Sequence, residues 1–206
     1  MRYLDDRVKA RAYLLAALVA AGCAGRGQLV AETGEHRLTA EDPVSGLTAV
    51  LTTEVWEGDP DTLDEDWTVV HMLVANLSSE PILLAPGDFE LRDERGFRYE
   101  LIDPGATFHE VDPDRRHEAY GRQYRRDYDP GGPVDFTPMI PPGNAGQQAL
   151  PWGVLEPGTQ MRGFLYFEPV AATANGAQLT WRVTKPDHTR VVDMRFDLVV
   201  ARDGRR

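Results

Sequence analysis

The sequence predicts an all-β protein, namely an antiparallel β-sandwich of about seven or eight strands with one long, partly helical insert. Three observations favour this fold class. Short segments rich in β-branched and aromatic residues recur along the chain, turn-forming residues separate them, and strands do not alternate with helices as they do in parallel sheets. The 206 residues suffice for one domain with a core of its own.

The first 22 residues have the pattern of a secretory signal peptide: a basic start, a short apolar run and small residues at the end. The basic side chains are those of Arg2, Arg7, Lys9 and Arg11. The apolar stretch from Ala12 to Gly22 is about half of the roughly 20 residues that span a bilayer, so no transmembrane helix is expected here.

Cys23 is the only cysteine and directly follows Ala21 and Gly22. This order resembles a bacterial lipoprotein signal with its lipobox, although Ala20 stands where leucine is most usual. The resemblance implies cleavage before Cys23, acyl chains including palmitate on that residue, and a lipid-anchored protein in the bacterial cell envelope. Ala24 in place of aspartate implies the outer membrane if the cell is Gram-negative. The alternative is an ordinary signal peptide before an unmodified cysteine, but a secreted chain rarely keeps one free thiol.

The mature chain is strongly acidic. Removal of the signal peptide, with its four basic and two acidic residues, leaves 18 basic and 31 acidic residues and a net charge of −13. This balance argues against nucleic acid as a partner and against charge-driven binding to anionic membranes. No cofactor is expected. With Cys23 acylated, the fold has no disulfide and depends on burial and hydrogen bonds.

Residues 23–45 are polar and show no clear period, so we expect a tether that ends in a short edge strand near residues 36–38. The first regular strand is expected over residues 47–56. The segment 67–77 is apolar on both faces, as is typical of a central strand. Between these two strands, residues 57–66 form a turn-rich acidic loop.

Later strands are expected over residues 82–84, 89–92, 97–101, 163–168, 178–183 and 192–200. Gly96 can adopt the positive φ that a tight hairpin between the second and third of these requires. In the last strand, apolar side chains alternate with Asp193, Arg195 and Asp197, which indicates a half-buried antiparallel strand. The sandwich domain is therefore expected over residues 46–202.

Several short motifs follow one another in order: VANLS at 74–78, FELRD at 89–93, GFRY at 96–99, LEPG at 155–158 and GFLYF at 163–167. Their order over residues 45–200 resembles the Ig-like domains of unknown function on bacterial secreted proteins and lipoproteins, which are similar to immunoprotective extracellular proteins. The resemblance implies an Ig-like sandwich and no catalytic residues.

Residues 103–146 depart from this strand rhythm and are long for a sandwich loop. A helix is expected over residues 115–128. It would place three tyrosines on one face beside arginines, and these residue types are enriched at interface hot spots. We therefore predict a partner-binding surface of Tyr120, Tyr124, Tyr128, Arg122 and Arg125. The alternative is that the tyrosines cover an open edge of the sandwich while the arginines pair with its acids.

Candidate metal ligands have little support. The acidic loop 57–66 offers oxygen ligands that suit Ca²⁺, but its spacing is not that of an EF-hand, so a solvated loop is favoured. His71 lies in the expected central strand and is interpreted as a hydrogen-bonded core residue rather than a metal ligand.

No serine lies in a nucleophile elbow, and no glycine-rich loop leads from a strand into a helix. The sequence thus predicts a lipid-anchored envelope protein with a non-catalytic binding or structural domain. Its expected partners are the membrane, through Cys23, and an envelope protein, through the insert. The alternative is an envelope hydrolase with an unrecognised acidic site, because any two of the many carboxylates could form a catalytic pair.

Overall fold

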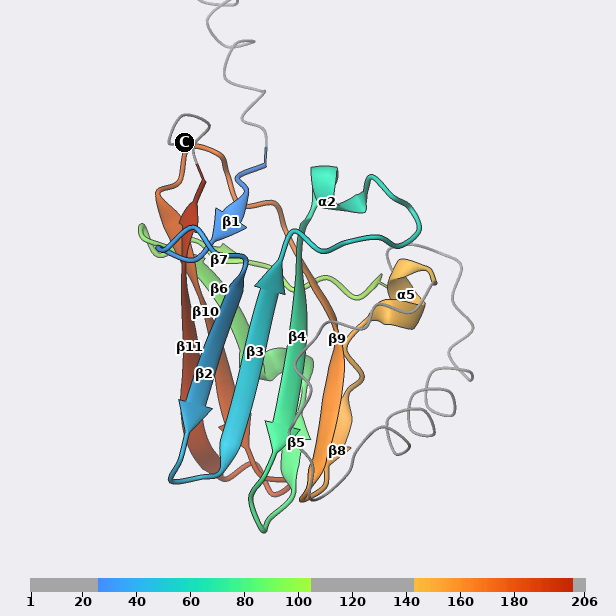
Figure 1. Ribbon diagram of the computed structural model, residues 1–206, viewed down its shortest axis with the longest axis vertical. Helices are drawn as coiled ribbons and strands as arrows, with labels where there is room; N and C mark the ends of the chain where they lie inside the picture. Colours follow the sequence, from blue (N-terminus) through green and yellow to red (C-terminus); the bar gives the residue numbers. More distant parts are fainter. Residues whose placement is uncertain (1–25, 105–142, 202–206) are drawn as a thin grey trace, which may run out of the picture.

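The computed structural model describes residues 26–104 and 143–201, which form two antiparallel sheets packed face to face (Figure 1). The seven-stranded sheet contains β1 (Leu29–Val30), β5 (Ile82–Leu84), β6 (Phe89–Asp93), β7 (Arg98–Tyr99), β8 (Gly153–Leu155), β10 (Gly176–Thr184) and β11 (Arg190–Val200). The four-stranded sheet contains β2 (Arg37–Asp42), β3 (Leu47–Thr53), β4 (Thr68–Asn76) and β9 (Thr159–Phe167). Short helices are α2 (Leu63–Asp66), α5 (Ala145–Gln148) and the 3-10 turn η1 (Pro86–Asp88).

Strands β10 and β11 are the centre of the seven-stranded sheet, whose order is β1-β11-β10-β5-β8, with β6 also paired to β10 and β7 paired to β6. The alternation expected for the last strand is confirmed. Its residues Met194, Phe196 and Leu198 are buried, whereas Arg195 and Asp197 are exposed. The inner face therefore supplies large apolar side chains to the core, and the outer face is charged.

The four-stranded sheet has the order β2-β3-β4-β9, and its central strand β4 is buried along its whole length. One face of β4, with Met72 and Val74, packs into the main core between the sheets. The opposite face is also buried because further chain lies over it. Trp56, Leu63 of α2 and Ala145 of α5 pack there against Val69 of β4 and against Phe164 and Tyr166 of β9. This second apolar cluster explains why the strand is apolar on both faces.

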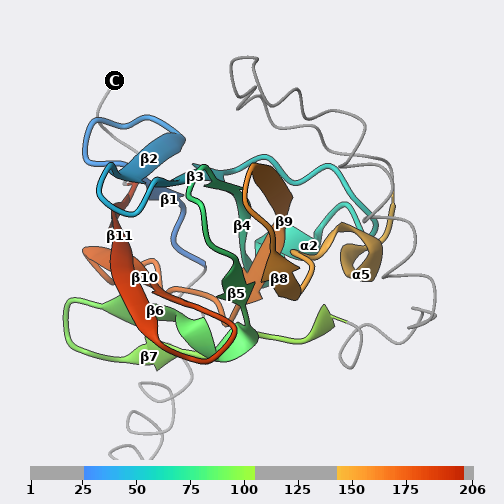
Figure 2. The same ribbon diagram turned by 90° about the horizontal axis from the view of Figure 1, so that it is seen from below.

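The main core is aromatic at its centre. Trp181 of β10 stacks on Phe89 of β6 with ring centroids 5.7 Å apart, and both side chains are almost fully buried. Figure 2 shows the two sheets end-on, facing each other.

The expected all-β antiparallel sandwich is confirmed, but the described residues form eleven strands rather than seven or eight. The additional strands are β1 and β8, which have two and three residues and are too short to show a period. The strand expected over residues 97–101 is present as the shorter β7. The hairpin at 93–96 is confirmed: Gly96 has a φ of 84°, and Asp93 Oδ1 accepts hydrogen bonds from the N–H groups of Arg95 and Phe97.

The N-terminal boundary of the domain differs from the expectation. Residues 26–42 were expected mainly as a tether, but β1 pairs with β11 and β2 pairs with β3 along six residues. The reason is tertiary, since Leu29 and Val30 are buried against the sandwich although their short segment has no pattern of its own. Among the described residues, no helix is long and apolar enough to cross a membrane.

Candidate functional site

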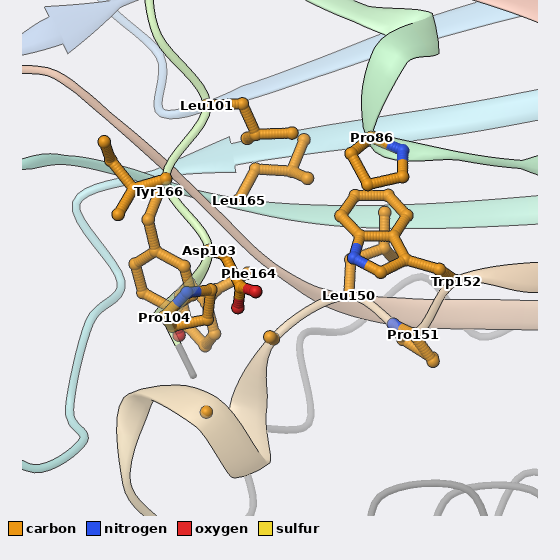
Figure 3. Close-up of a pocket in the computed structure, with 13 residues that line it drawn as sticks. Pro86, Leu101, Asp103, Pro104, Leu150, Pro151, Trp152, Phe164, Leu165 and Tyr166 are labelled. Atoms are coloured by element: carbon orange, nitrogen blue, oxygen red, sulfur yellow. The ribbon is translucent and has the colours of Figure 1, made fainter. Parts of the chain in front are cut away.

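A cavity of about 240 Å³ lies beside β9 (Figure 3). Four segments line it: Pro86 of η1, residues 101–104 after β7, Gly146 of α5 with residues 149–152 that follow this helix, and residues 164–166 of β9. Only the last is part of a long strand. The cavity is therefore formed where irregular chain passes over the edge of the four-stranded sheet.

Backbone hydrogen bonds hold two of these segments on the edge of β9. The Ile102 N–H donates to the Tyr166 carbonyl oxygen at 2.7 Å, and the Leu150 N–H donates to the Phe164 carbonyl oxygen at 2.9 Å. Since both acceptors belong to β9, the strand edge fixes the spacing of the two walls. The Tyr166 hydroxyl donates to the Ala145 carbonyl oxygen at 2.8 Å and so fixes α5 as well.

Close packing also positions the wall at residues 149–150. A Cβ atom on Gly163 would lie 2.5 Å from the backbone N and Cα of Leu150, so β9 can approach this segment only with glycine there. The capping box of Asn144 and Gln147 starts the neighbouring helix α5 at a defined residue. The wall is therefore set by backbone contacts and not by side chains alone.

The lining of the cavity is chiefly apolar. Figure 3 shows Leu101, Leu150, Trp152 and Leu165 around it, with the carboxylate of Asp103 at one side. Asp103 is the one carboxylate among the described lining residues. Such a lining suits an apolar group, whereas glycoside hydrolysis uses two carboxyl groups across the scissile bond.

The predicted partner-binding residues cannot be placed relative to this cavity. Tyr120, Tyr124, Tyr128, Arg122 and Arg125 lie outside the described residues. Both described ends of the insert, however, belong to the cavity region, because Pro104 and Gly146 line it. The insert thus leaves from and returns to the wall of the cavity.

His71 lies on the outer face of the four-stranded sheet and is 3% exposed. Its ring meets the edge of Phe164 on β9 at 5.1 Å between centroids. Burial, with a smaller contribution from the positive charge of Arg162, lowers the pKa of His71 from 6.5 to about 4. His71 is therefore neutral at pH 7. The expected burial in a central strand is confirmed, whereas the ring contact seen among the described residues is the aromatic one with Phe164 and not the expected hydrogen bond.

The acidic loop 57–66 is tied to the rest of the domain. The Trp56 indole N–H donates to the Pro60 carbonyl oxygen at 2.7 Å, and the Ala145 N–H donates to the Asp59 carbonyl oxygen at 3.1 Å. Part of the loop forms the short helix α2, which the sequence did not indicate. Its first residue, Leu63, is buried and fixes the helix on the domain. Across residues 26–104 and 143–201, no group of three or more His, Cys, Asp or Glu side chains could hold a metal ion.

The start of the described chain is fixed firmly. Arg26 pairs with Glu54 through two contacts, of 3.1 and 3.3 Å, and its backbone bridges to Ala171. The next residue, Gly27, donates its N–H to the Val170 carbonyl oxygen at 2.7 Å. Cys23 itself lies outside the described residues, only three positions before Arg26.

Sequence reasoning did not find the cavity. Its walls are irregular segments, and strand periodicity says nothing about those. One signal was present: the apolar residues Leu150 and Trp152 lie in the segment that links the insert to the next strand.

Comparison with known proteins identifies no family for this chain. No family model matches it, and no curated protein matches it. A crystal structure that does match is that of a protein described as a candidate lipoprotein, YcdA, from Bacillus subtilis subsp. subtilis str. 168, with 12% sequence identity and a TM-score of 0.39. The match covers 77% of this chain and 38% of that protein, so this chain spans well under half of its length. Similarity at this level does not establish a shared family, and the Ig-like resemblance stays a prediction.

Proposed function

We propose that this protein is a lipid-anchored component of the bacterial cell envelope, whose β-sandwich is a binding or structural module without catalytic activity. The observation that carries the proposal is the position of Cys23, which is the only cysteine and directly follows the small residues that end the apolar signal segment. The anchor would be in the outer membrane if the cell is Gram-negative.

Metabolic labelling with an alkyne analogue of palmitate tests the anchor. Wild-type protein expressed in a bacterial host is expected to take up the label and to fractionate with membranes, and Cys23→Ser is expected to lose the label completely. Ala24→Ser is the matched control, because it changes the neighbouring residue and leaves the thiol in place. Equal labelling of wild type and Cys23→Ser would refute lipidation at this residue.

We propose further that the insert binds an envelope protein through Tyr120, Tyr124, Tyr128, Arg122 and Arg125. Tyrosine and arginine are the residue types that dominate protein–protein hot spots. The insert also begins and ends beside an apolar cavity, at Pro104 and Gly146. Ile102 and Leu150, which lie just outside these ends, are hydrogen-bonded to β9, and long loops carried by a stable scaffold often have a function.

Crosslinking in native membranes compares full-length protein, a variant lacking residues 108–140, and a variant with Tyr120, Tyr124 and Tyr128 changed to alanine. A binding role predicts that one specific protein is captured by the full-length chain and lost from both variants, while thermal unfolding stays cooperative. If both variants lose the cooperative transition, the insert has a structural role and the binding proposal is wrong.

The hydrolase alternative gains no support from the described residues. The cavity offers Asp103 as its one described carboxylate, and a glycosidase needs an acid and a second carboxylate at a defined separation. An assay for glycoside hydrolysis with wild type and Asp103→Asn is the direct test, and we expect no activity from either protein.

A further inference from the structure

We propose that the folded domain rests directly on the phospholipid headgroups, with the end of the sandwich that carries β1 and the β6–β7 turn facing the membrane and Phe97 in contact with it. This inference rests on the proposed lipidation of Cys23. It adds an orientation and a contact surface that lipidation alone does not imply, because a long tether would let the domain tumble freely.

The first argument is the length of chain between the anchor and the fold. Arg26 is held by the bidentate pair with Glu54, and the exposed fractions of the two side chains are only 13% and 18%. Gly27 is bonded to Val170, and β1 follows at once in the seven-stranded sheet. Only Ala24 and Gly25 separate Cys23 from this fixed point.

These two residues allow very little reach. The three Cα–Cα steps from Cys23 to Arg26 span at most about 11 Å, since consecutive Cα atoms are 3.8 Å apart. A headgroup layer is itself about 5–7 Å thick. A nine-residue strand such as β4 is, in contrast, about 30 Å long. The anchor can therefore bring only one end of the sandwich to the membrane.

That end is defined by the sheet register. Leu29 of β1 pairs with Val200 at the end of β11, and Ala177 near the start of β10 pairs with Asp93 at the end of β6. The β6–β7 turn, residues 94–97, consequently lies at the same end as β1. Figure 1 shows β1, α2 and the C-terminal end of β11 together at the top, with the β2–β3 turn at the bottom.

The second argument is an exposed aromatic side chain at this end. Phe97 is 58% exposed, although phenylalanine is usually buried. It lies between Gly96 of the tight turn and the exposed Arg98; the exposed Arg95, two positions earlier, pairs with Asp93 at 3.4 Å. An aromatic side chain beside arginines is a combination that favours the membrane interface, where the ring is buried and the guanidinium groups reach phosphates.

The charge of this end determines which lipids suit it. Glu32 and Glu35, in the link from β1 to β2, and the loop 57–66, in the link from β3 to β4, lie there too by chain connectivity, and their carboxylates repel anionic headgroups. The contact is therefore expected with zwitterionic headgroups. The short anchor, and not net charge, holds the domain there, and position 97 is where the contact forms.

A fluorescent label on a single introduced cysteine tests the orientation. Once Cys23 is acylated, an added cysteine is the only free thiol, so labelling is specific. Phe97→Cys places the label at the proposed contact. Val44→Cys is the matched control, because Val44 is also an exposed apolar residue, at 96%, and lies in the β2–β3 turn at the opposite end. Both lipidated proteins are reconstituted in phosphatidylcholine vesicles that contain a headgroup-attached quencher.

We expect the label at position 97 to lose most of its fluorescence and the label at position 44 to lose almost none. A flexible Gly-Ser linker inserted between Gly25 and Arg26 should restore most of the fluorescence at position 97. Equal quenching at the two positions, or quenching at position 97 that survives the linker, would overturn the proposed orientation. Mass spectrometry of the N-terminal peptide separates the two hypotheses: an unacylated Cys23 refutes the anchor, whereas an acylated protein with equal quenching refutes the orientation alone.

Discussion

Asn76 shows how much structure a single side chain can hold in this protein. At the end of β4 it is fully buried, and its amide nitrogen donates to the carbonyl oxygens of Glu80 and Leu155. Its Oδ1 accepts from the N–H and the hydroxyl of Ser78. A strand that ends in asparagine was visible in the sequence, but the link from β4 to the following turn and to β8 was not, because Leu155 is 79 positions away.

Replacement of Asn76 by alanine should therefore be costly. It leaves the buried Leu155 carbonyl oxygen without its donor and removes the support of the turn, so we expect a loss of about 2–4 kcal/mol in the free energy of unfolding. Urea denaturation measures the change. Ser79→Ala, in the same turn at an exposed position, is the control and should be close to neutral. A loss below about 1 kcal/mol for Asn76→Ala would contradict this role.

His71 predicts a dependence of stability on pH. Its pKa is about 4 in the folded protein, against 6.5 for an ordinary histidine, so between these values the unfolded chain binds a proton that the folded protein does not. Stability should hence decrease as the pH falls from about 6.5 to 4, by up to about 3 kcal/mol from this residue.

The variant His71→Gln isolates that contribution, since it cannot titrate. Urea denaturation of both proteins at pH 7.5 and pH 4.5 should give a smaller pH-dependent loss for the variant, because the carboxylates titrate in both. Identical losses in the two proteins would show that His71 does not titrate with a lowered pKa.

At the scale of elements, the contact between β9 and residues 149–150 leaves no room for a side chain at position 163. Gly163→Ala would force its Cβ against the Leu150 backbone, so we expect a loss of about 2–3 kcal/mol through overpacking. Gly87→Ala is the matched control. A Cβ there meets nothing within 4 Å, so its effect should be within about 0.5 kcal/mol.

Thermal and urea unfolding of the two alanine variants provide the comparison. Because residues 149–150 also form one wall of the cavity, Gly163→Ala should widen or distort that wall as well as lower stability. Equal stability of the two variants would mean that the segment can move away from β9 without loss.

The accuracy of the sequence predictions also varies from element to element. The strands β4, β10 and β11 were predictable because each has eight or more consecutive residues with one regular pattern of apolar side chains. The burial in the structure follows the same pattern. Strand β1 was missed because two residues cannot show a period and because its partner, β11, is about 170 positions away. The cavity was missed for a related reason, since backbone contacts between distant irregular segments build it.

At the scale of the whole molecule, the domain starts well before residue 46. A chain that begins at Gly25 should unfold as cooperatively as the mature protein. A chain that begins at His36 lacks the buried Leu29 and Val30 and should lose about 3 kcal/mol or more. A chain that begins at Gly46 also lacks β2 and should be less stable still.

Circular dichroism melts of the three chains test this boundary. The result that would contradict it is equal stability of the chains that begin at Gly25 and at Gly46, because residues 26–45 would then be a dispensable tether. The fold class, in contrast, was predictable at this scale. Turn residues punctuate the sequence at short intervals, and no helical period competes with the strands.

The pairing of β1 with β11 has a consequence for how the protein is made. Leu29 lies opposite Val200, and β11 alone supplies Met194, Phe196 and Leu198 to the core. Contacts at such separation in sequence form slowly, because a large loop must close before they are gained. The sandwich therefore cannot be completed before its last strand has been synthesised, and this delay favours the export proposed above, which needs an unfolded chain.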